Sequence, residues 1–158
     1  MLIRFVTSVA LLSTGLLAGA FGYGAVNVAT TFHAVPLEVR LTFHAALMKM
    51  NGPVMQTTMA VAALSSLTLA FLARGAARLL AAGAGTLAVA SFLITRFGNI
   101  PINGRIKQWA TGSVPADYAA ILDRWDAFNI TRTSTALVAF LAIIALAAVV
   151  RRTPEPTV

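Results

Sequence analysis

Hydrophobic residues in this chain gather into four long stretches that polar segments separate. The stretches run over residues 3–32, 53–73, 79–95 and 133–150, approximately. Each is close to the ~20 residues that an α-helix needs to cross the hydrocarbon core of a bilayer. The pattern predicts an all-α fold, a four-helix transmembrane bundle, with residues 1–158 forming a single membrane domain.

The first hydrophobic stretch allows two interpretations. Arg4, an apolar run and the small residues Ala18-Gly19-Ala20 follow the order of a cleaved signal peptide. The apolar run continues beyond them through Tyr23 and Val28, however. This continuation favours a helix that stays in the protein.

Polar residues concentrate in two connections, 33–52 and 96–132, which four spans place on the same side of the membrane. In the first connection a short amphipathic helix is expected from about Leu37 to Met50. The reason is that Arg40, His44, Leu47 and Asn51 recur at spacings of four, three and four, which is one helical face. His33 precedes this helix, in the part of the connection expected to be unstructured. Pro53 suits the first turn of the second span.

The second connection contains the segment Asn99-Ile-Pro-Ile-Asn103. We expect it to break or bend the third helix, because Pro101 has no N–H and its ring clashes with the preceding turn. A loop should follow at residues 111–115. A second short helix is expected from about Ala116 to Asn129. It leads into span four with one stripe of residues at helical spacing: Tyr118, Trp125, Asn129 and Arg132.

Composition excludes several classes of protein. The chain is 58% hydrophobic and 11% charged, with a mean hydropathy of +0.82, which is typical of an integral membrane protein. The formal charge of +7 does not indicate a nucleic-acid partner. The basic residues are scattered at span ends, where they face lipid headgroups. The absence of cysteine excludes disulfide exchange, haem thioether attachment and thiolate metal sites.

Membrane orientation follows less directly from the charges. Four spans place both termini and the connection 74–78 on one side, with five basic residues, and leave seven basic residues on the other side. A bare count of Lys and Arg would therefore put the termini outside. We favour cytoplasmic termini in a bacterial-type plasma membrane, because the seven lie among acidic residues in longer connections.

The polar residues of the connections have structural interpretations as well as functional ones. The aromatic residues Trp109, Tyr118 and Trp125 fit the aromatic belt of a membrane interface. Asn99 and Asn103 can satisfy backbone groups that Pro101 leaves unpaired. The Arg132 side chain can extend from span four to the interface.

The two histidines are the only side chains whose ordinary pKa lies near neutrality. His44 is the stronger candidate for chemistry, because its helical face also carries Arg40 and Asn51. The histidines lie eleven residues apart without an HxxxH pair, which leaves at most a sparse His/His/carboxylate metal site. No cofactor is expected, although a metal borrowed through His44 or His33 remains an open alternative.

Three sequence features together resemble a known family. Asn99-x-Pro101-x-Asn103, a tryptophan before the last span at Trp125, and Asn129-x-x-Arg132-Thr133 are similar to the anthrone oxygenase-like integral membrane family. The resemblance extends over nearly the whole chain. It implies oxidation of an anthrone to an anthraquinone by O₂, without a cofactor. Members often carry a histidine between the tryptophan and the arginine, where this chain has Asn129.

The resemblance implies roles for the candidate residues. His44 would be the base, and Arg132 with Asn103 would stabilise the developing oxyanion. The substrate-binding residues would be Asn99, Trp109, Tyr118, Trp125 and Asn129. The expected partners are a hydrophobic aromatic (anthrone- or quinol-like) molecule, O₂ and membrane lipid. The alternative is a non-enzymatic bundle that binds a lipid or small hydrophobic molecule, or an accessory subunit.

Overall fold

The computed structural model describes the backbone of residues 1–152 and the side chains of residues 1–150. Four helical rods run antiparallel, and the described residues contain no strand. The first rod comprises α1 (Leu2–Tyr23), the π-helical segment η1 (Gly24–Val28) and α2 (Ala29–Ala34). The second is α3 (Leu37–Leu72). The third joins α4 (Gly75–Ile94), the π-helical segment η2 (Thr95–Asn99) and α5 (Ile100–Trp109), and the last is α6 (Tyr118–Arg152). The expected all-α four-helix bundle is confirmed.

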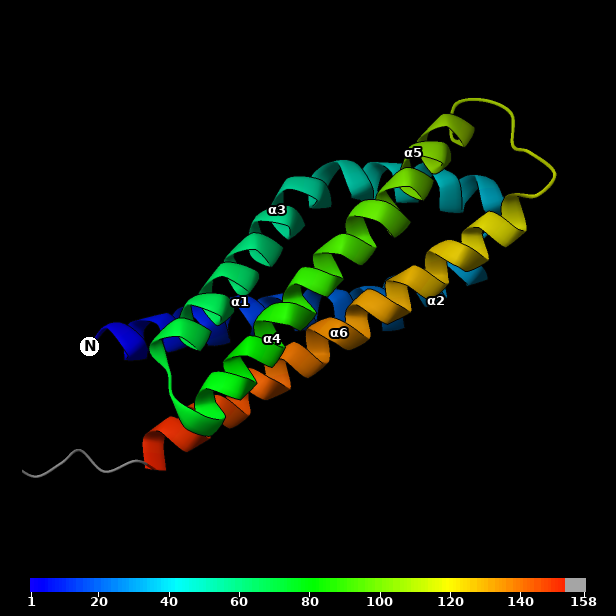
Figure 1. Ribbon diagram of the computed structural model, residues 1–158. Coiled ribbons are helices and arrows are strands. Elements are labelled where there is room, and N and C mark those ends of the chain that lie inside the picture. Colours follow the sequence, from blue (N-terminus) through cyan, green and yellow to red (C-terminus); the bar gives the residue numbers. More distant parts are fainter. Residues whose placement is uncertain (153–158) are drawn as a thin grey trace, which may run out of the picture.

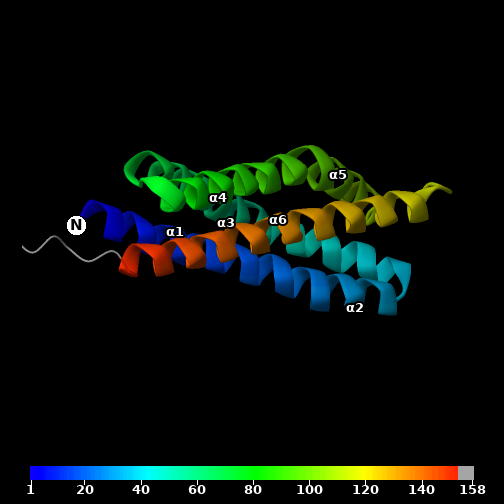
Figure 2. The ribbon, with the colours of Figure 1, turned by 60° about the horizontal axis from the view of Figure 1, so that its bottom comes forward.

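All four rods are long and apolar enough to cross a membrane, so the chain is an integral multi-pass membrane protein. They contain 33, 36, 35 and 33 residues, or about 50 Å each, which exceeds the ~30 Å of a hydrocarbon core. The N-terminus and the end of α6 lie at one end of the bundle (Figures 1 and 2). We call the opposite end, with the connections α2–α3 and α5–α6, the polar end.

The two short amphipathic helices that the sequence predicted are not separate elements. Residues 37–50 form the beginning of α3, and residues 118–129 form the beginning of α6. Pro53 therefore lies inside α3 and does not start a helix. Gly52 eases this arrangement because it has no Cβ to clash with the proline ring. The surrounding residues Lys49–Asn51 are exposed, so water can solvate the carbonyl group that Pro53 leaves without a donor. Figure 1 shows that α3 changes direction along its length.

Pro101 follows an interruption of the regular α-helical hydrogen bonding in the third rod, but the rod does not end there. The N–H of Ile100 bonds to the carbonyl group of Thr95, five residues back, which is the π-helical pattern. Pro101 then occupies the first turn of α5, directly after this π-helical segment. The rod continues to Trp109, and residues 111–117 form the expected loop.

Small residues allow the helices to pack closely at the end that holds the termini. The buried face of α4 consists of small residues only: Ala77, Ala81, Ala84, Gly85, Ala88 and Ser91. Helix α4 packs against α3 and α6, and α1 packs against the same two helices. Close backbone approach provides van der Waals contact, which is what holds helices together in lipid.

Gly85→Ala tests this packing against Gly83→Ala in the same helix. A Cβ on Gly85 would lie 2.6 Å from Cδ2 and 3.2 Å from the backbone nitrogen of Leu67, whereas a Cβ on Gly83 meets nothing within 4 Å. Both changes gain about 1 kcal/mol of helix propensity. We expect Gly83→Ala to keep or raise the melting temperature in detergent and Gly85→Ala to lower it. Equal melting temperatures for the two variants would show that α3 and α4 are not in close contact at Gly85.

Candidate functional site

A cavity of about 580 Å³ lies towards the polar end, among all four rods. This volume falls in the range of small-molecule sites. Phe21 and Met59, from an apolar cluster in the middle of the bundle, form one part of its wall. Phe32 and Trp125, from the apolar cluster at the polar end, form another. The cavity thus separates two parts of the hydrophobic core.

Both π-helical segments border this cavity. Gly24 and Val28 of η1 line it on one side, and Thr95 of η2 lines it on another. A π-helical turn inserts one residue relative to regular α-helix and re-aims the side chains that follow. In the third rod this turn comes just before Asn103, which also lines the cavity.

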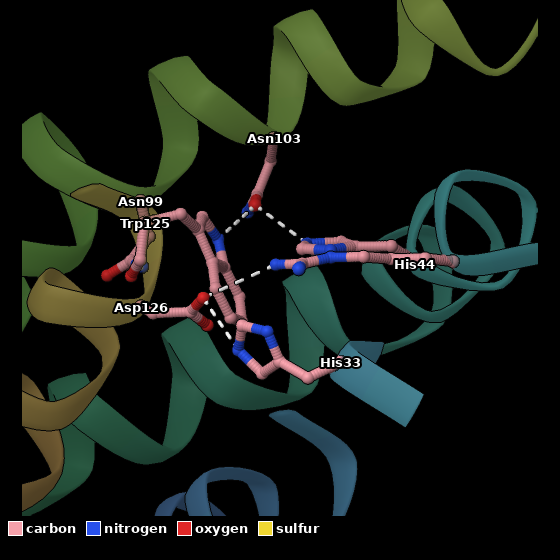
Figure 3. Close-up of polar contacts among 7 residues, drawn as sticks. His33, His44, Asn99, Asn103, Trp125 and Asp126 are labelled. Atoms are coloured by element: carbon pink, nitrogen blue, oxygen red, sulfur yellow. Dashed lines mark hydrogen bonds and ion pairs between the residues drawn. The ribbon is translucent and has the colours of Figure 1, made fainter. Parts of the chain in front are cut away.

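Asn103 is the centre of a polar network between three rods (Figure 3). Its Oδ1 accepts a hydrogen bond from Trp125 Nε1 at 2.7 Å and lies 3.2 Å from His44 Nε2. Its amide nitrogen donates to the sulfur of Met48 at 3.2 Å. Because an indole nitrogen can only donate, the oxygen of Asn103 must face Trp125. His44 Nε2 then carries a hydrogen and donates to the same oxygen.

His44 itself does not line the cavity. It is fully buried, stacked on Phe32 at 4.8 Å between ring centroids and edge-on to Trp125 at 4.6 Å. Its imidazole lies one residue behind the cavity wall, with Asn103 between them. That His44 acts as the base stays a prediction. To reach a substrate in the cavity, His44 would need the Asn103 side chain to move from its position between the imidazole and the cavity.

Arg132 lines the deeper part of the cavity with Asn129. Its Nε and Nη2 donate to Asn129 Oδ1 at 3.2 and 2.7 Å, and its guanidinium lies 4.4 Å from the centroid of the Phe21 ring. Within residues 1–150 no carboxylate lies within ion-pair distance of Arg132. The cavity therefore contains a cation that is held in place by neutral groups, an arrangement suited to binding an anion.

The backbone around Arg132 is fixed by neighbouring helices. Ser91 of α4 donates to the Arg132 carbonyl group at 3.2 Å. Thr133 donates to the carbonyl groups of Asn129 at 2.7 Å and of Phe21 at 3.4 Å. These contacts hold α6 to α4 and α1 at the depth where the guanidinium enters the cavity.

The structure brings together four of the eight site residues that the sequence suggested. Asn103, Trp125, Asn129 and Arg132 line the cavity, and His44 supports it from behind. Asn99 is fully buried and donates to the carbonyl group of Trp125 at 3.1 Å. Trp109 and Tyr118 pack in the apolar cluster at the polar end. These last three residues are not part of the cavity lining.

The sequence analysis did not identify several lining residues. Met48, Met55 and Met59 form a flexible apolar wall on α3, and Lys107 of α5 lines the polar end of the cavity. The sequence pattern does indicate the methionines, because they continue the helical face of His44 at spacings of four, seven and four residues. The expected helix boundary at Pro53 hid that continuity.

A second polar cluster holds α2, α3 and α6 together beside the cavity. Asp126 Oδ2 lies 3.0 Å from His33 Nε2 and 3.4 Å from Arg40 Nη2. The Arg40 guanidinium is buried and lies 5.5 Å from the centroid of the Phe32 ring. His33 was expected in an unstructured segment but belongs to α2, because the first rod continues to Ala34. Among the described residues, no three His, Asp or Glu side chains gather as metal ligands would.

Comparison with known proteins gives one family. Residues 39–142 match the family described as anthrone oxygenase, which confirms the resemblance noted from the sequence. No curated protein and no solved structure matches the chain. The matched residues include those that carry the Asn103 network and Arg132.

Asp126→Asn tests the cluster beside the cavity. The change keeps the shape of residue 126 but leaves the buried Arg40 without its carboxylate, which should cost about 2 kcal/mol. We expect a lower melting temperature in detergent. Asp123→Asn, an exposed position on the same helix, is the control and should leave the melting temperature unchanged. An Asp126→Asn variant as stable as the control would mean that Arg40 does not need this carboxylate.

Proposed function

We propose that this chain, which belongs to the anthrone oxygenase family, is a membrane oxygenase that oxidises an anthrone-like aromatic molecule with O₂. The observation that carries the proposal is the cavity between the four rods, with Arg132 in its wall and no carboxylate partner for that arginine in the described residues. A hydrophobic substrate would enter from the lipid. The apolar wall of methionine and aromatic side chains suits flat rings.

The reaction balances without another oxidant. An anthrone and one O₂ give an anthraquinone and one water. The methylene group opposite the carbonyl group loses a proton, and the resulting enolate transfers an electron to O₂. The two radicals combine into a peroxide on the same carbon. The peroxide takes up the first proton to become a hydroperoxide. Loss of the second C–H proton with cleavage of the O–O bond then gives the new carbonyl group and hydroxide, and the second proton converts hydroxide into water. We propose that no cofactor takes part, because the enolate itself supplies the electrons.

Arg132 would stabilise the enolate oxygen. A preorganised donor of this kind typically contributes ~3 kcal/mol to the transition state. Phe21 and Asn129 hold the guanidinium, so little reorganisation is needed as charge develops on the substrate. The same cation attracts an acidic substrate before reaction.

Asn103 would act at the reacting carbon, which lies across the central ring from the enolate oxygen. Trp125 and Arg132 are seven residues apart on α6, or about 10 Å. Asn103 is hydrogen-bonded to Trp125, so its amide group lies at the Trp125 level of the cavity. Its oxygen is occupied by Trp125 and His44, and one amide N–H donates to Met48, which leaves the second amide N–H group for the substrate. We propose that this N–H group stabilises the peroxide.

A binding function without catalysis is the second candidate. None of the residues that line the cavity carries a carboxylate or an imidazole group, so the wall itself offers no evident base. A bundle that only binds a hydrophobic anion would need the same cavity and the same arginine. Anthrone-dependent O₂ uptake by the purified protein, above the spontaneous rate, separates the two functions.

We also propose a bacterial-type plasma membrane with cytoplasmic termini. The short segments at the terminal end carry five basic residues, Arg4, Arg74, Arg78, Arg151 and Arg152, against one acidic residue, Glu155. Basic residues in short loops favour the cytoplasmic side. The opposite orientation would place the polar end, and with it the cavity, on the cytoplasmic side.

Arg132→Lys tests the anion-binding role. Lysine keeps the charge but loses the planar group that contacts Asn129 twice and lies on Phe21. We expect anthrone-dependent O₂ uptake to fall about 10²-fold, nearly as far as in Arg132→Ala. Arg124→Lys, an exposed position on the same helix, should retain full activity. An Arg132→Lys variant with wild-type activity would remove Arg132 from the mechanism.

His44→Gln tests how the imidazole acts. We propose that His44 positions Asn103, and a glutamine amide can donate the same hydrogen bond to Asn103 Oδ1. We expect His44→Gln to retain turnover within about tenfold of wild type, and His44→Leu, which cannot donate, to lose substantially more.

The base role predicts a different result for the same variants. His44→Gln would then lose about 10²-fold or more, nearly as much as His44→Leu. Melting curves for each variant show whether a loss comes from unfolding. Turnover should be corrected for the uncatalysed oxidation.

A further inference from the structure

The charges in the cavity wall all have one sign. Of the residues that line the cavity, only Arg132 and Lys107 are charged, and neither Asp nor Glu is among them. Within the described residues neither side chain has a carboxylate within ion-pair distance. The proposed reaction uses one cation, at the enolate oxygen. It gives no role to Lys107.

Lys107 lies far from Arg132 along the cavity. Asn103 and Trp125 are hydrogen-bonded and lie at one level. Lys107 is one helical turn beyond Asn103 towards the polar end, and Arg132 is two turns beyond Trp125 in the opposite direction. The two cationic residues are therefore about 16 Å apart along the bundle, measured between their backbones. Because both side chains reach several ångströms inwards, the remaining gap suits a fused aromatic ring system with a substituent.

We propose that the substrate of this protein is an anionic aromatic polycycle, with a carboxylate on an outer ring that Lys107 binds. The inference rests on the proposed function, because Arg132 is taken to hold the enolate oxygen at the other end. Lys107 shares a helical face with Asn103, four residues before it, and this face borders the cavity. Lys107 would thus determine specificity and leave the reacting carbon untouched.

The alternative role for Lys107 is contact with lipid headgroups, which its exposure allows. Arg105 provides the matched control. It is exposed on the same helix, two residues earlier, and does not line the cavity. A general effect of positive charge at the polar end would appear equally in Arg105→Met and Lys107→Met. Methionine keeps the apolar stem in both.

Equilibrium binding in a nonionic detergent tests the inference with two product-like probes, anthraquinone and anthraquinone-2-carboxylate. Quenching of tryptophan fluorescence reports binding, because Trp125 lines the cavity. We expect wild type and Arg105→Met to bind the carboxylate at least about fivefold more tightly than the neutral probe at low salt. Lys107→Met should bind both probes with similar affinity and keep the wild-type affinity for anthraquinone.

Two results would overturn the inference alone. They are a carboxylate preference that survives in Lys107→Met, and a preference that Arg105→Met loses to the same extent. Either result leaves anthraquinone binding and anthrone-dependent O₂ uptake intact, so the proposed function would stand. If wild type binds neither probe, the cavity is not the site of an aromatic substrate, and the inference fails together with the proposed function.

Discussion

The hydrogen bond from Trp125 to Asn103 determines the arrangement of the candidate site. An indole nitrogen can donate but cannot accept, so it fixes which end of the Asn103 amide group faces α6. This choice fixes the hydrogen on His44 Nε2 and leaves the amide nitrogen of Asn103 towards Met48 and the cavity. One donor thereby orients side chains from α3, α5 and α6. A buried network of this kind is costly unless its members are satisfied together, which makes the local geometry specific.

Much of this site could be predicted from the sequence because helical periodicity survives in long rods. Trp125, Asn129 and Arg132 form a stripe at spacings of four and three, and all three line the cavity. Asn103 was identified through the motif around Pro101, and the third rod does depart from regular α-helix just before it. Hydropathy alone was enough for the four spans.

Other features depend on information that periodicity does not carry. The proline at position 53 indicated a helix start, but Gly52 and the exposed turn before it let α3 continue. The error hid the face on which His44 and the methionines of the cavity wall lie. His33 was assigned to an unstructured segment, because the first rod continues further than expected and the carboxylate that His33 contacts is 93 residues away, on α6. The burial of Asn99 behind Trp125 likewise depends on how two rods approach each other.

The location of the cavity meets two requirements that usually conflict, access from lipid and a polar partner for an anion. An apolar aromatic molecule concentrates in lipid, whereas its anion needs a polar partner that lipid does not supply. The rods are longer than the hydrocarbon core is thick, so the bundle can hold an arginine among aromatic and amide groups between its middle and its polar end. The cation is oriented before the substrate arrives, and in a site of low polarity its attraction for an enolate exceeds that in water. In the proposed reaction, a membrane location would therefore be part of how the site makes the methylene C–H bond of an anthrone acidic enough to give an enolate, which then reacts with O₂.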